Sequence, residues 1–191
     1  MEDRYELKSA RYLAREILLK TVRPGDTAVD ATMGNGHDTL LLCETVGPGG
    51  HVYAFDVQPL AVENTEALLR GHGLLDRAEL IRAGHERMAE YVKEAVSAVV
   101  FNLGWLPGGD HRITTRWETT RQAVLSALEL LRPLGCVILC AYPGHPEGDR
   151  ERQEITALLS ALPNTRYNVL RQCFLNAGPG APECFVIQKN A

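Results

Sequence analysis

The chain has 191 residues, of which 45% are hydrophobic and 23% are charged, and its formal net charge is −4. These values are typical of a globular protein, and we expect a single domain over residues 1–191. No apolar run is long enough to span a membrane, and the N-terminal residues lack the apolar core of a signal peptide. We therefore expect a cytoplasmic protein with no membrane partner. The acidic charge excludes a global attraction to nucleic acid but permits a local basic face.

Strand-like and helix-like segments alternate along the chain, which is typical of an α/β fold with a doubly wound sheet. Helices are expected over residues 7–21, 37–46, 58–70, 117–131 and 147–162. Strands are expected over residues 26–31, 51–55, 78–81, 97–103, 135–141, 167–174 and 183–189. This pattern resembles the class I S-adenosylmethionine-dependent methyltransferase arrangement, a Rossmann-like seven-stranded sheet with a terminal antiparallel strand.

The first predicted helix is amphipathic and carries Lys8, Arg11 and Arg15 on its polar face. We expect residues 1–22 to pack on or cap the active-site face.

The five cysteines form no CxxC pair and no metal-ligand spacing. We therefore expect no metal site, and reduced, mostly buried thiols. Cys173 falls inside the strand expected over residues 167–174, so we expect it to be a core residue rather than a nucleophile for carbon methylation.

The segment from Asp30 to Thr39 predicts a strand, a glycine turn and a helix start in direct succession. Gly34 and Gly36 permit a sharp turn and the close approach of a ligand to the backbone, and the next helix offers free N–H groups. Asp56 ends the next strand about 20 residues beyond the second glycine, the distance at which an acid commonly bonds ribose hydroxyls.

Two cofactor classes compete for this turn. A dinucleotide site needs a small residue three positions after the second glycine, where this chain has Thr39. Asp30 and Thr32 begin a D-x-T-x-G-x-G sequence, and an acid there suits the cationic amino group of S-adenosylmethionine better than a pyrophosphate. This favours a methyltransferase over a nicotinamide dehydrogenase, although Asp30 as a strand-end cap is the alternative.

The loop after the fourth strand begins with Asn102 and contains Trp105. It resembles the N-P-P-Y/F/W motif of methyltransferases that modify nitrogen. The asparagine carbonyl can accept hydrogen bonds from an amine, and the indole offers a stacking face for a base. The alternative is a glycine-rich loop with a core tryptophan.

Six motifs along the chain resemble the MnmM-type (YtqB-like) tRNA 5-(aminomethyl)-2-thiouridylate methyltransferases, formerly labelled rRNA methylases. They are D-A-T-M-G-N-G-H-D-T, F-D-V-Q, G-H-E, F-N-L-G-W-L-P-G-G-D, I-T-T and Y-P-G-H-P-E-G. Members of this family use S-adenosylmethionine to methylate the aminomethyl nitrogen of 5-aminomethyl-2-thiouridine at the tRNA wobble position. The resemblance implies the tRNA anticodon region as partner, and family analogy implies a homodimer. There are two alternatives. One is methylation of another RNA, including rRNA, or of a small amine, and the other is a catalytically silent cofactor-binding module.

The resemblance also implies roles for individual residues. Asn35 and Asp38 are expected near the methionine moiety, Asp56 and Gln58 around the ribose and adenine, and His85 beside the adenine. Together with the turn and loop residues, the expected cofactor set is Asp30, Thr32, Gly34, Asn35, Gly36, Asp38, Asp56, Gln58, His85 and Asn102. Trp105 stands where the family more commonly has tyrosine, so stacking is retained and a phenolic role is not.

Methyl transfer to an amine needs mainly positioning and removal of water. The expected catalytic set is Asn102, Trp105, Asp110 and Tyr142, and the unranked candidates for proton acceptor are Asp110, His111, Tyr142 and His145. RNA contacts are expected from Lys8, Arg11, Arg112 and Arg116, with Arg15 and Arg121 as further basic candidates.

Overall fold

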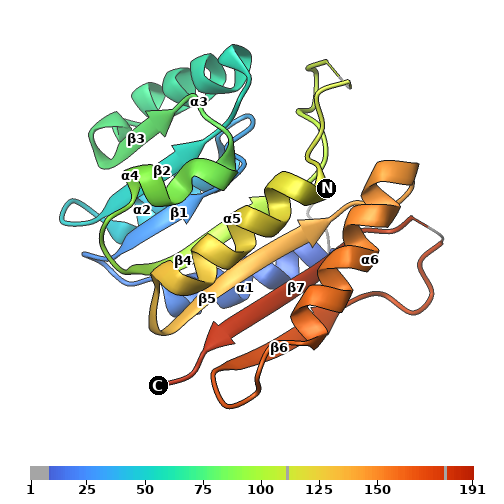
Figure 1. Ribbon diagram of the computed structural model, residues 1–191. Helices are drawn as coiled ribbons and strands as arrows, with labels where there is room; N and C mark the ends of the chain where they lie inside the picture. The colour runs from blue at the N-terminus through green and yellow to red at the C-terminus, as the bar shows by residue number, and fades with distance from the viewer. Residues whose placement is uncertain (1–8, 111, 179) are drawn as a thin grey trace.

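A single seven-stranded sheet runs through the computed structural model, which describes residues 9–110, 112–178 and 180–191. Its strands are β1 (Thr27–Asp30), β2 (His51–Phe55), β3 (Ala78–Ile81), β4 (Val96–Asn102), β5 (Leu131–Ala141), β6 (Tyr167–Gln172) and β7 (Glu183–Lys189). The order is β3-β2-β1-β4-β5-β7-β6, and β7 is antiparallel to both of its neighbours (Figure 1). The expected α/β class and terminal antiparallel strand are therefore confirmed.

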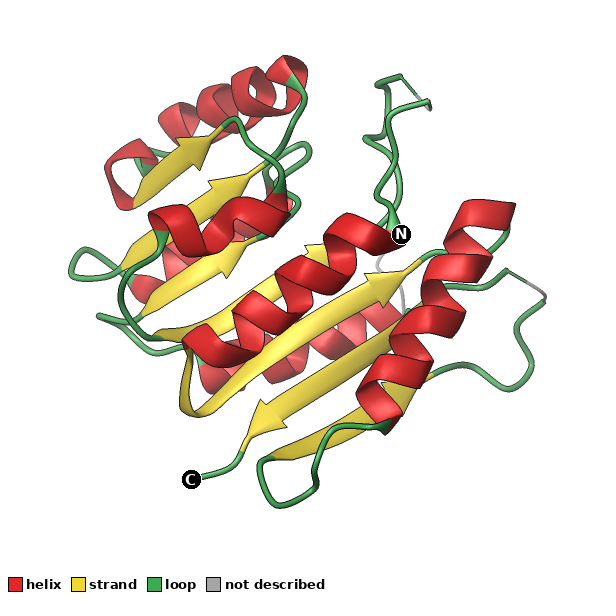
Figure 2. Cartoon of the chain, viewed as in Figure 1, coloured by secondary structure: helices red, strands yellow, loops and turns green. Residues whose placement is uncertain are grey.

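Helices cover both faces of the sheet (Figure 2). They are α1 (Ala10–Thr21), α2 (His37–Val46), α3 (Pro59–Gly71), α4 (Met88–Tyr91), α5 (Trp117–Leu130) and α6 (Pro146–Ser160), with 3-10 turns η1 (Leu75–Arg77) and η2 (His85–Arg87). The buried side chains form two main clusters, one beneath α1, α2 and α3 and the other beneath α4, α5 and α6. Neighbouring strand residues such as Ala28 and Val29 enter opposite clusters, which explains why the central strands are apolar on both faces.

The helix ends follow local chemistry. The Ser9 side chain accepts a hydrogen bond from the Tyr12 amide at the start of α1, and Pro59 and Pro146 occupy first-turn positions of α3 and α6. Gly36, with φ of 82°, is the N-cap residue of α2. α1 lies along β4, β5 and β7 on the same face of the sheet as α2.

Several expectations differ from the structure. β6 ends at Gln172, so Cys173 lies in the following loop and is exposed, and its expected place in the core is wrong. The other four cysteines are buried, as expected. The short α4, η1 and η2 were not expected because three or four residues cannot carry a hydrophobic period. Of the first predicted helix, the part before Ser9 lies outside the described residues.

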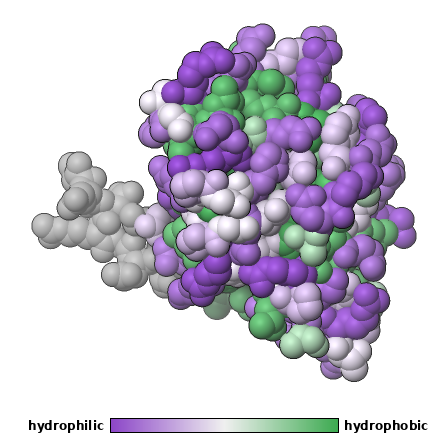
Figure 3. Space-filling model, turned by 90° about the vertical axis from the view of Figure 1, so that its left-hand side faces the viewer, coloured by the Kyte–Doolittle hydropathy of each residue, from purple (hydrophilic) through white to green (hydrophobic). Residues whose placement is uncertain are grey.

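Hydrophilic side chains dominate the face seen from the β3 and α3 side, with smaller hydrophobic patches among them (Figure 3). Within the described ranges, every helix is too short or too polar to cross a bilayer.

Candidate active site

A cavity of about 720 Å³ opens at the carboxyl ends of the parallel strands. The loops after β1, β2, β3, β4 and β5 all contribute to its wall. β1 and β4 are neighbours in the sheet although β2 and β3 lie between them in the chain, so the chain reverses its winding direction there. Ligands of open α/β sheets bind at this kind of switch point.

The turn between β1 and α2 forms one side of the cavity. Gly34 and Gly36 have φ values of 52° and 82°, which residues other than glycine rarely adopt. A Cβ atom on Gly36 would also lie 2.9 Å from the Thr65 hydroxyl of α3, so this turn packs closely on α3. The Thr65 hydroxyl donates to the Gly34 carbonyl at 3.1 Å and fixes the turn.

Asp56 faces this turn from the end of β2. One carboxylate oxygen accepts from the Gly34 amide at 3.2 Å and the other from the Gln58 amide at 2.9 Å. Burial raises the pKa of Asp56, whereas the two backbone donors lower it. Gln58 is 8% exposed, and both side chains line the cavity. The remaining lone pairs of the carboxylate are suited to neighbouring hydroxyl groups.

Asp30 lies behind the cavity wall rather than on it. Its carboxylate is fully buried and accepts from the Thr39 hydroxyl at 2.7 Å and the Thr32 amide at 3.2 Å. Burial and the nearby Asp38 raise its pKa to about 7. Asp30 therefore does not contact the cavity directly. Its carboxylate instead connects the turn to α2.

His85 closes another side of the cavity and is only 7% exposed. Burial lowers its pKa, so the ring is neutral near pH 7. Its Nδ1 lies 3.3 Å from the Ala31 carbonyl oxygen, and the carbonyl can only accept, so we assign the proton to Nδ1. This leaves Nε2 as a hydrogen-bond acceptor.

Asn102 links the loop after β4 to the turn between β1 and α2. Its backbone amide donates to the Thr32 hydroxyl at 2.7 Å, and its side-chain Nδ2 donates to Asp38 at 2.5 Å. The direction of the second bond leaves Oδ1 as the free end of the amide, and this oxygen is buried without a hydrogen-bond partner in the described part of the chain. Asn35 adds a second link, because its Nδ2 donates to the Pro107 carbonyl at 3.3 Å.

Trp105 lies on the loop that follows β4, and 40% of it is exposed. Its ring lies 4.8 Å from that of His145, the N-cap residue of α6, and a β-bridge joins it to Thr114. The core-tryptophan alternative is therefore wrong for Trp105, and Trp117, 9% exposed, is the buried one.

The structure brings most of the expected site residues to the cavity but not all of them. Thr32, Gly34, Asn35, Asp38, Asp56, Gln58, His85, Asn102, Trp105, Arg116, Tyr142 and His145 line it. Asp30, Gly36, Asp110 and Arg112 do not appear in its wall. Asp110 instead forms an ion pair of 2.7 Å with the exposed Arg112.

Two of the remaining basic candidates lie on helices outside the cavity wall. Arg15 and Arg121 are exposed on α1 and α5. Lys8 and His111 lie outside the described residues, as does the side chain of Arg11.

Two features of the site carry no sequence signal. Gly144 and Gly180 bring two loops into contact beside the cavity, where a Cβ on Gly180 would lie 2.9 Å from the Gly144 Cα. Glu151 of α6 is a buried carboxylate behind the loop that holds Trp105. Contacts between residues so far apart in the chain produce no periodic pattern in the sequence. Over the described ranges, no group of three or more potential metal ligands is present.

Comparisons with known proteins agree with this geometry. Residues 52–188 match the model of the family described as "Putative rRNA methylase". The chain is 40% identical over 166 residues to the Arabidopsis thaliana protein named tRNA (mnm(5)s(2)U34)-methyltransferase, chloroplastic. That match covers 82% of this chain but only 61% of the length of the plant protein.

Two solved structures resemble the whole chain. A Clostridium thermocellum protein described as "putative rRNA-methylase" is 39% identical with a TM-score of 0.95, covering 97% of this chain and 100% of that one. A Streptococcus mutans protein described as "a putative methyltransferase" and solved in complex with SAH is 32% identical with a TM-score of 0.87, covering 95% of this chain and 98% of that one. The fold is that of a class I methyltransferase, and the chain belongs to the rRNA methylase family whose model it matches.

Proposed function

We propose that this protein transfers a methyl group from S-adenosylmethionine to the aminomethyl nitrogen of 5-aminomethyl-2-thiouridine at the wobble position of tRNA. The observation that carries the proposal is the position of Asn102, which is hydrogen-bonded to both Thr32 and Asp38 of the cofactor turn while it begins the loop that holds Trp105. A group that binds at Asn102 is therefore brought next to whatever the turn holds.

The cavity residues fit S-adenosylmethionine, which supplies an electrophilic methyl group on a sulfonium centre. The Asp56 carboxylate, with its two backbone donors, retains lone pairs for the two ribose hydroxyls. The neutral His85 presents an acceptor nitrogen that suits the amino group of adenine. The Streptococcus mutans relative was solved with SAH, the compound that remains after the methyl group has left.

Asn102 suits an amine as methyl acceptor. Oδ1 of Asn102 is buried without a partner, and a buried acceptor left unpaired costs about 1–3 kcal/mol. An N–H of the substrate amine supplies the missing donor and points the nitrogen lone pair away from Asn102. The nitrogen then forms the new N–C bond as the C–S bond breaks, the bonding electrons pass to sulfur, and the amine releases a proton.

The geometry reduces the number of candidates for the proton acceptor. His145 uses Nδ1 to accept from the Gly148 amide at 3.1 Å, so its neutral ring has its proton on Nε2 and no lone pair to spare. Asp110 is paired with Arg112 away from the cavity wall. Of the four candidates named from the sequence, Tyr142 is then the one left on the described cavity wall. Trp105 offers its indole face to the substrate base.

The tRNA anticodon region as partner is supported by the name of the Arabidopsis relative, and Arg116 lies at the cavity edge where a phosphate of the RNA could reach it. A homodimer and a cytoplasmic location stay predictions from the resemblance and the composition.

The direct test is mass spectrometry of nucleosides from tRNA that lacks the methyl mark, incubated with the protein and S-adenosylmethionine. We expect 5-methylaminomethyl-2-thiouridine to appear at the wobble position. Methylation of rRNA, or of free amines at the same rate as tRNA, would contradict the proposed substrate and leave the methyl-transfer chemistry in place.

Asn102→Ala is expected to lower kcat by on the order of 10²-fold, because it removes the acceptor that orients the amine. The affinity for S-adenosylmethionine should change little, because Asp56 and His85 remain. Asn168→Ala, which alters an exposed asparagine of β6, is the matched control. A folded Asn102→Ala protein with the wild-type single-turnover rate would exclude the amine-directing role.

A further inference from the structure

Glu151, in the second turn of α6, is a carboxylate held in the core with 3% exposure. Its Oε2 accepts from the Thr115 hydroxyl at 2.8 Å, and its Oε1 accepts from the Thr120 hydroxyl at 2.5 Å. Among the residues that the structure describes, no lysine, arginine or histidine forms an ion pair with it. Burial raises the pKa of Glu151, and the negative charges of Glu147 and Glu118 nearby raise it further.

Thr115 connects this carboxylate to the loop after β4. Its hydroxyl accepts from the Gly104 amide at 2.8 Å, and its own amide donates to the Gly104 carbonyl at 3.0 Å. The next pair along the loop is the β-bridge between Trp105 and Thr114. These contacts join the two ends of the loop over residues 103–115, which projects from the sheet between β4 and α5 (Figure 1), and Thr115 links the joined ends to Glu151.

The charge of Glu151 gives this chain of hydrogen bonds a direction. A carboxylate can only accept, so the Thr115 hydroxyl must donate to it and keep a lone pair free for the Gly104 N–H. An amide or a protonated acid at this position could also donate, and the hydroxyl could then turn away from Gly104. A buried carboxylate without a cation is a cost to stability that a neutral residue of similar shape would not carry.

We propose that Glu151 is a positioning residue for methyl transfer, which fixes the loop over residues 103–115 so that Trp105 and the adjoining Asn102 hold the substrate base in the reactive position. α6 supports the loop at a second point, because the His145 ring contacts Trp105. Glu151 does not line the cavity, and its described contacts are to Thr115 and Thr120. This inference rests on the proposed function.

The test compares Glu151→Gln with Glu147→Gln, a change on the same helix at a residue that lies 3.9 Å from Arg150 and, over the described part of the chain, makes no side-chain hydrogen bond to the loop. For Glu151→Gln we expect a Tm equal to or above that of the wild type, unchanged affinity for S-adenosylmethionine, and a loss in kcat/KM for tRNA on the order of 10- to 10²-fold. Glu147→Gln should keep the wild-type kcat/KM. Thr115→Val, which breaks the same chain from the loop side, is expected to reproduce the loss and decides the matter if Glu151→Gln does not fold.

A second readout does not depend on activity. The protein has two tryptophans, Trp105 and Trp117, so labelling with 5-fluorotryptophan gives two ¹⁹F resonances that Trp105→Phe assigns. We expect the Trp105 resonance to shift or broaden in Glu151→Gln and to stay unchanged in Glu147→Gln. A wild-type protein that methylates no tRNA would end the proposed function, and this spectrum would still report whether Glu151 holds the loop. An unchanged Trp105 resonance with wild-type kcat/KM, or an activity loss that follows a lowered Tm or weakened cofactor binding, would overturn the positioning role.

Discussion

Burial and the neighbouring carboxylates Asp38 and Asp56 raise the pKa of Asp30. The pKa of this side chain is raised from 3.8 to about 7, first by burial and second by Asp38. The unfolded chain loses the proton near its ordinary value, so between the two values the folded protein holds one more proton than the unfolded chain. The stability of the folded protein must therefore fall as the pH rises through this window, and level off above about pH 7.

Asp30→Asn is expected to remove this slope. Between about pH 5 and about pH 7 the wild type should lose about 2 kcal/mol of unfolding free energy relative to the variant, as measured by urea denaturation at each pH. The quantity to compare is the slope of the unfolding free energy against pH and not its absolute value. The Asn amide has one acceptor oxygen fewer for Thr39 and Thr32 and therefore lowers stability at every pH. Asp76→Asn, at an exposed aspartate of η1, is the control and should keep the wild-type slope. Parallel curves for the wild type and Asp30→Asn would contradict the raised pKa.

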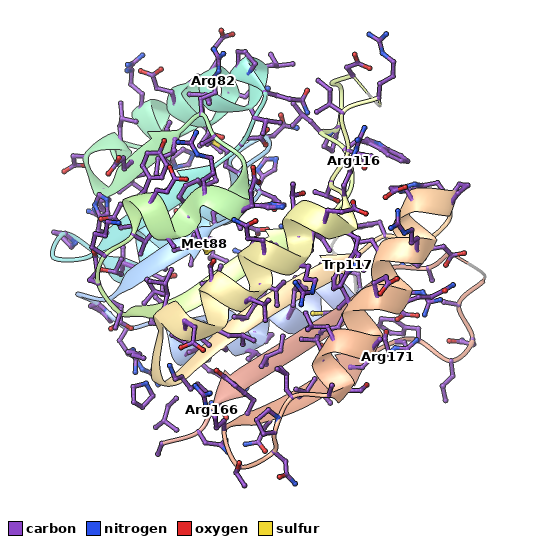
Figure 4. All side chains as sticks on the ribbon, in the orientation of Figure 1. Arg82, Met88, Arg116, Trp117, Arg166 and Arg171 are labelled. Carbon is purple, nitrogen blue, oxygen red and sulfur yellow. The ribbon has the colours of Figure 1, made fainter. Side chains whose placement is uncertain are left out.

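At the scale of single elements, the loop after β4 separates two arginines that look equivalent in the sequence. Arg112 is 90% exposed in its side chain and makes a forked contact with Asp110, at 3.0 and 3.1 Å from Nε. Arg116 is the N-cap residue of α5 and lines the cavity. Figure 4 shows it at the base of the loop, next to Trp117 on the first turn of the helix.

Arg116→Ala is therefore expected to raise the KM for tRNA and to reduce the slope of log KM against log salt by about 1, the effect of one lost phosphate contact. Arg112→Ala should have a smaller effect, because its charge is already neutralised by Asp110. Arg166→Ala, at an exposed arginine outside the cavity wall, is the control. Equal effects of Arg116→Ala on tRNA and on the free modified nucleoside would show that this arginine does not hold the RNA backbone.

Elements with strong local signals could be predicted from the sequence. The bounds of α2 agree because glycines stand at both ends, with φ of 82° at Gly36 and 66° at Gly47. The sequence pattern predicts a strand two residues longer than β6, because Cys173 and Phe174 continue the apolar pattern while the chain leaves the sheet after Gln172. The local composition does not predict the residue at which a strand stops pairing with its neighbour in the sheet.

At the scale of the whole molecule, the sheet order brings together segments that are far apart in the chain. Thr32 and Asn102 are 70 positions apart and bond because β1 and β4 are neighbours. The sequence predicted both loops, since each follows an apolar strand and contains residue types suited to a ligand. It could not predict that Asp30 lies behind the cavity wall or that Glu151 meets Thr115, because burial of one polar side chain against another depends on tertiary packing that leaves no local pattern.

The fold as a unit should respond to its cofactor. A ligand that binds only the folded state stabilises it by about 2.7 kcal/mol at a concentration about 100 times its Kd. We expect S-adenosylmethionine to produce this increase in the unfolding free energy, measured by urea denaturation with and without the ligand, and NAD to produce none.

Asp56→Ala links that global response to the site. It removes two charge-assisted acceptor oxygens and should weaken cofactor binding by about 1.5–3 kcal/mol. At the same ligand concentration about half to nine-tenths of the stabilisation by S-adenosylmethionine is then lost, because the ratio of ligand concentration to Kd falls about 10- to 10²-fold. Asp76→Ala, away from the cavity wall, should respond as the wild type does. Stabilisation by NAD in place of S-adenosylmethionine would contradict the methyltransferase assignment, since a dinucleotide site would then occupy the turn between β1 and α2.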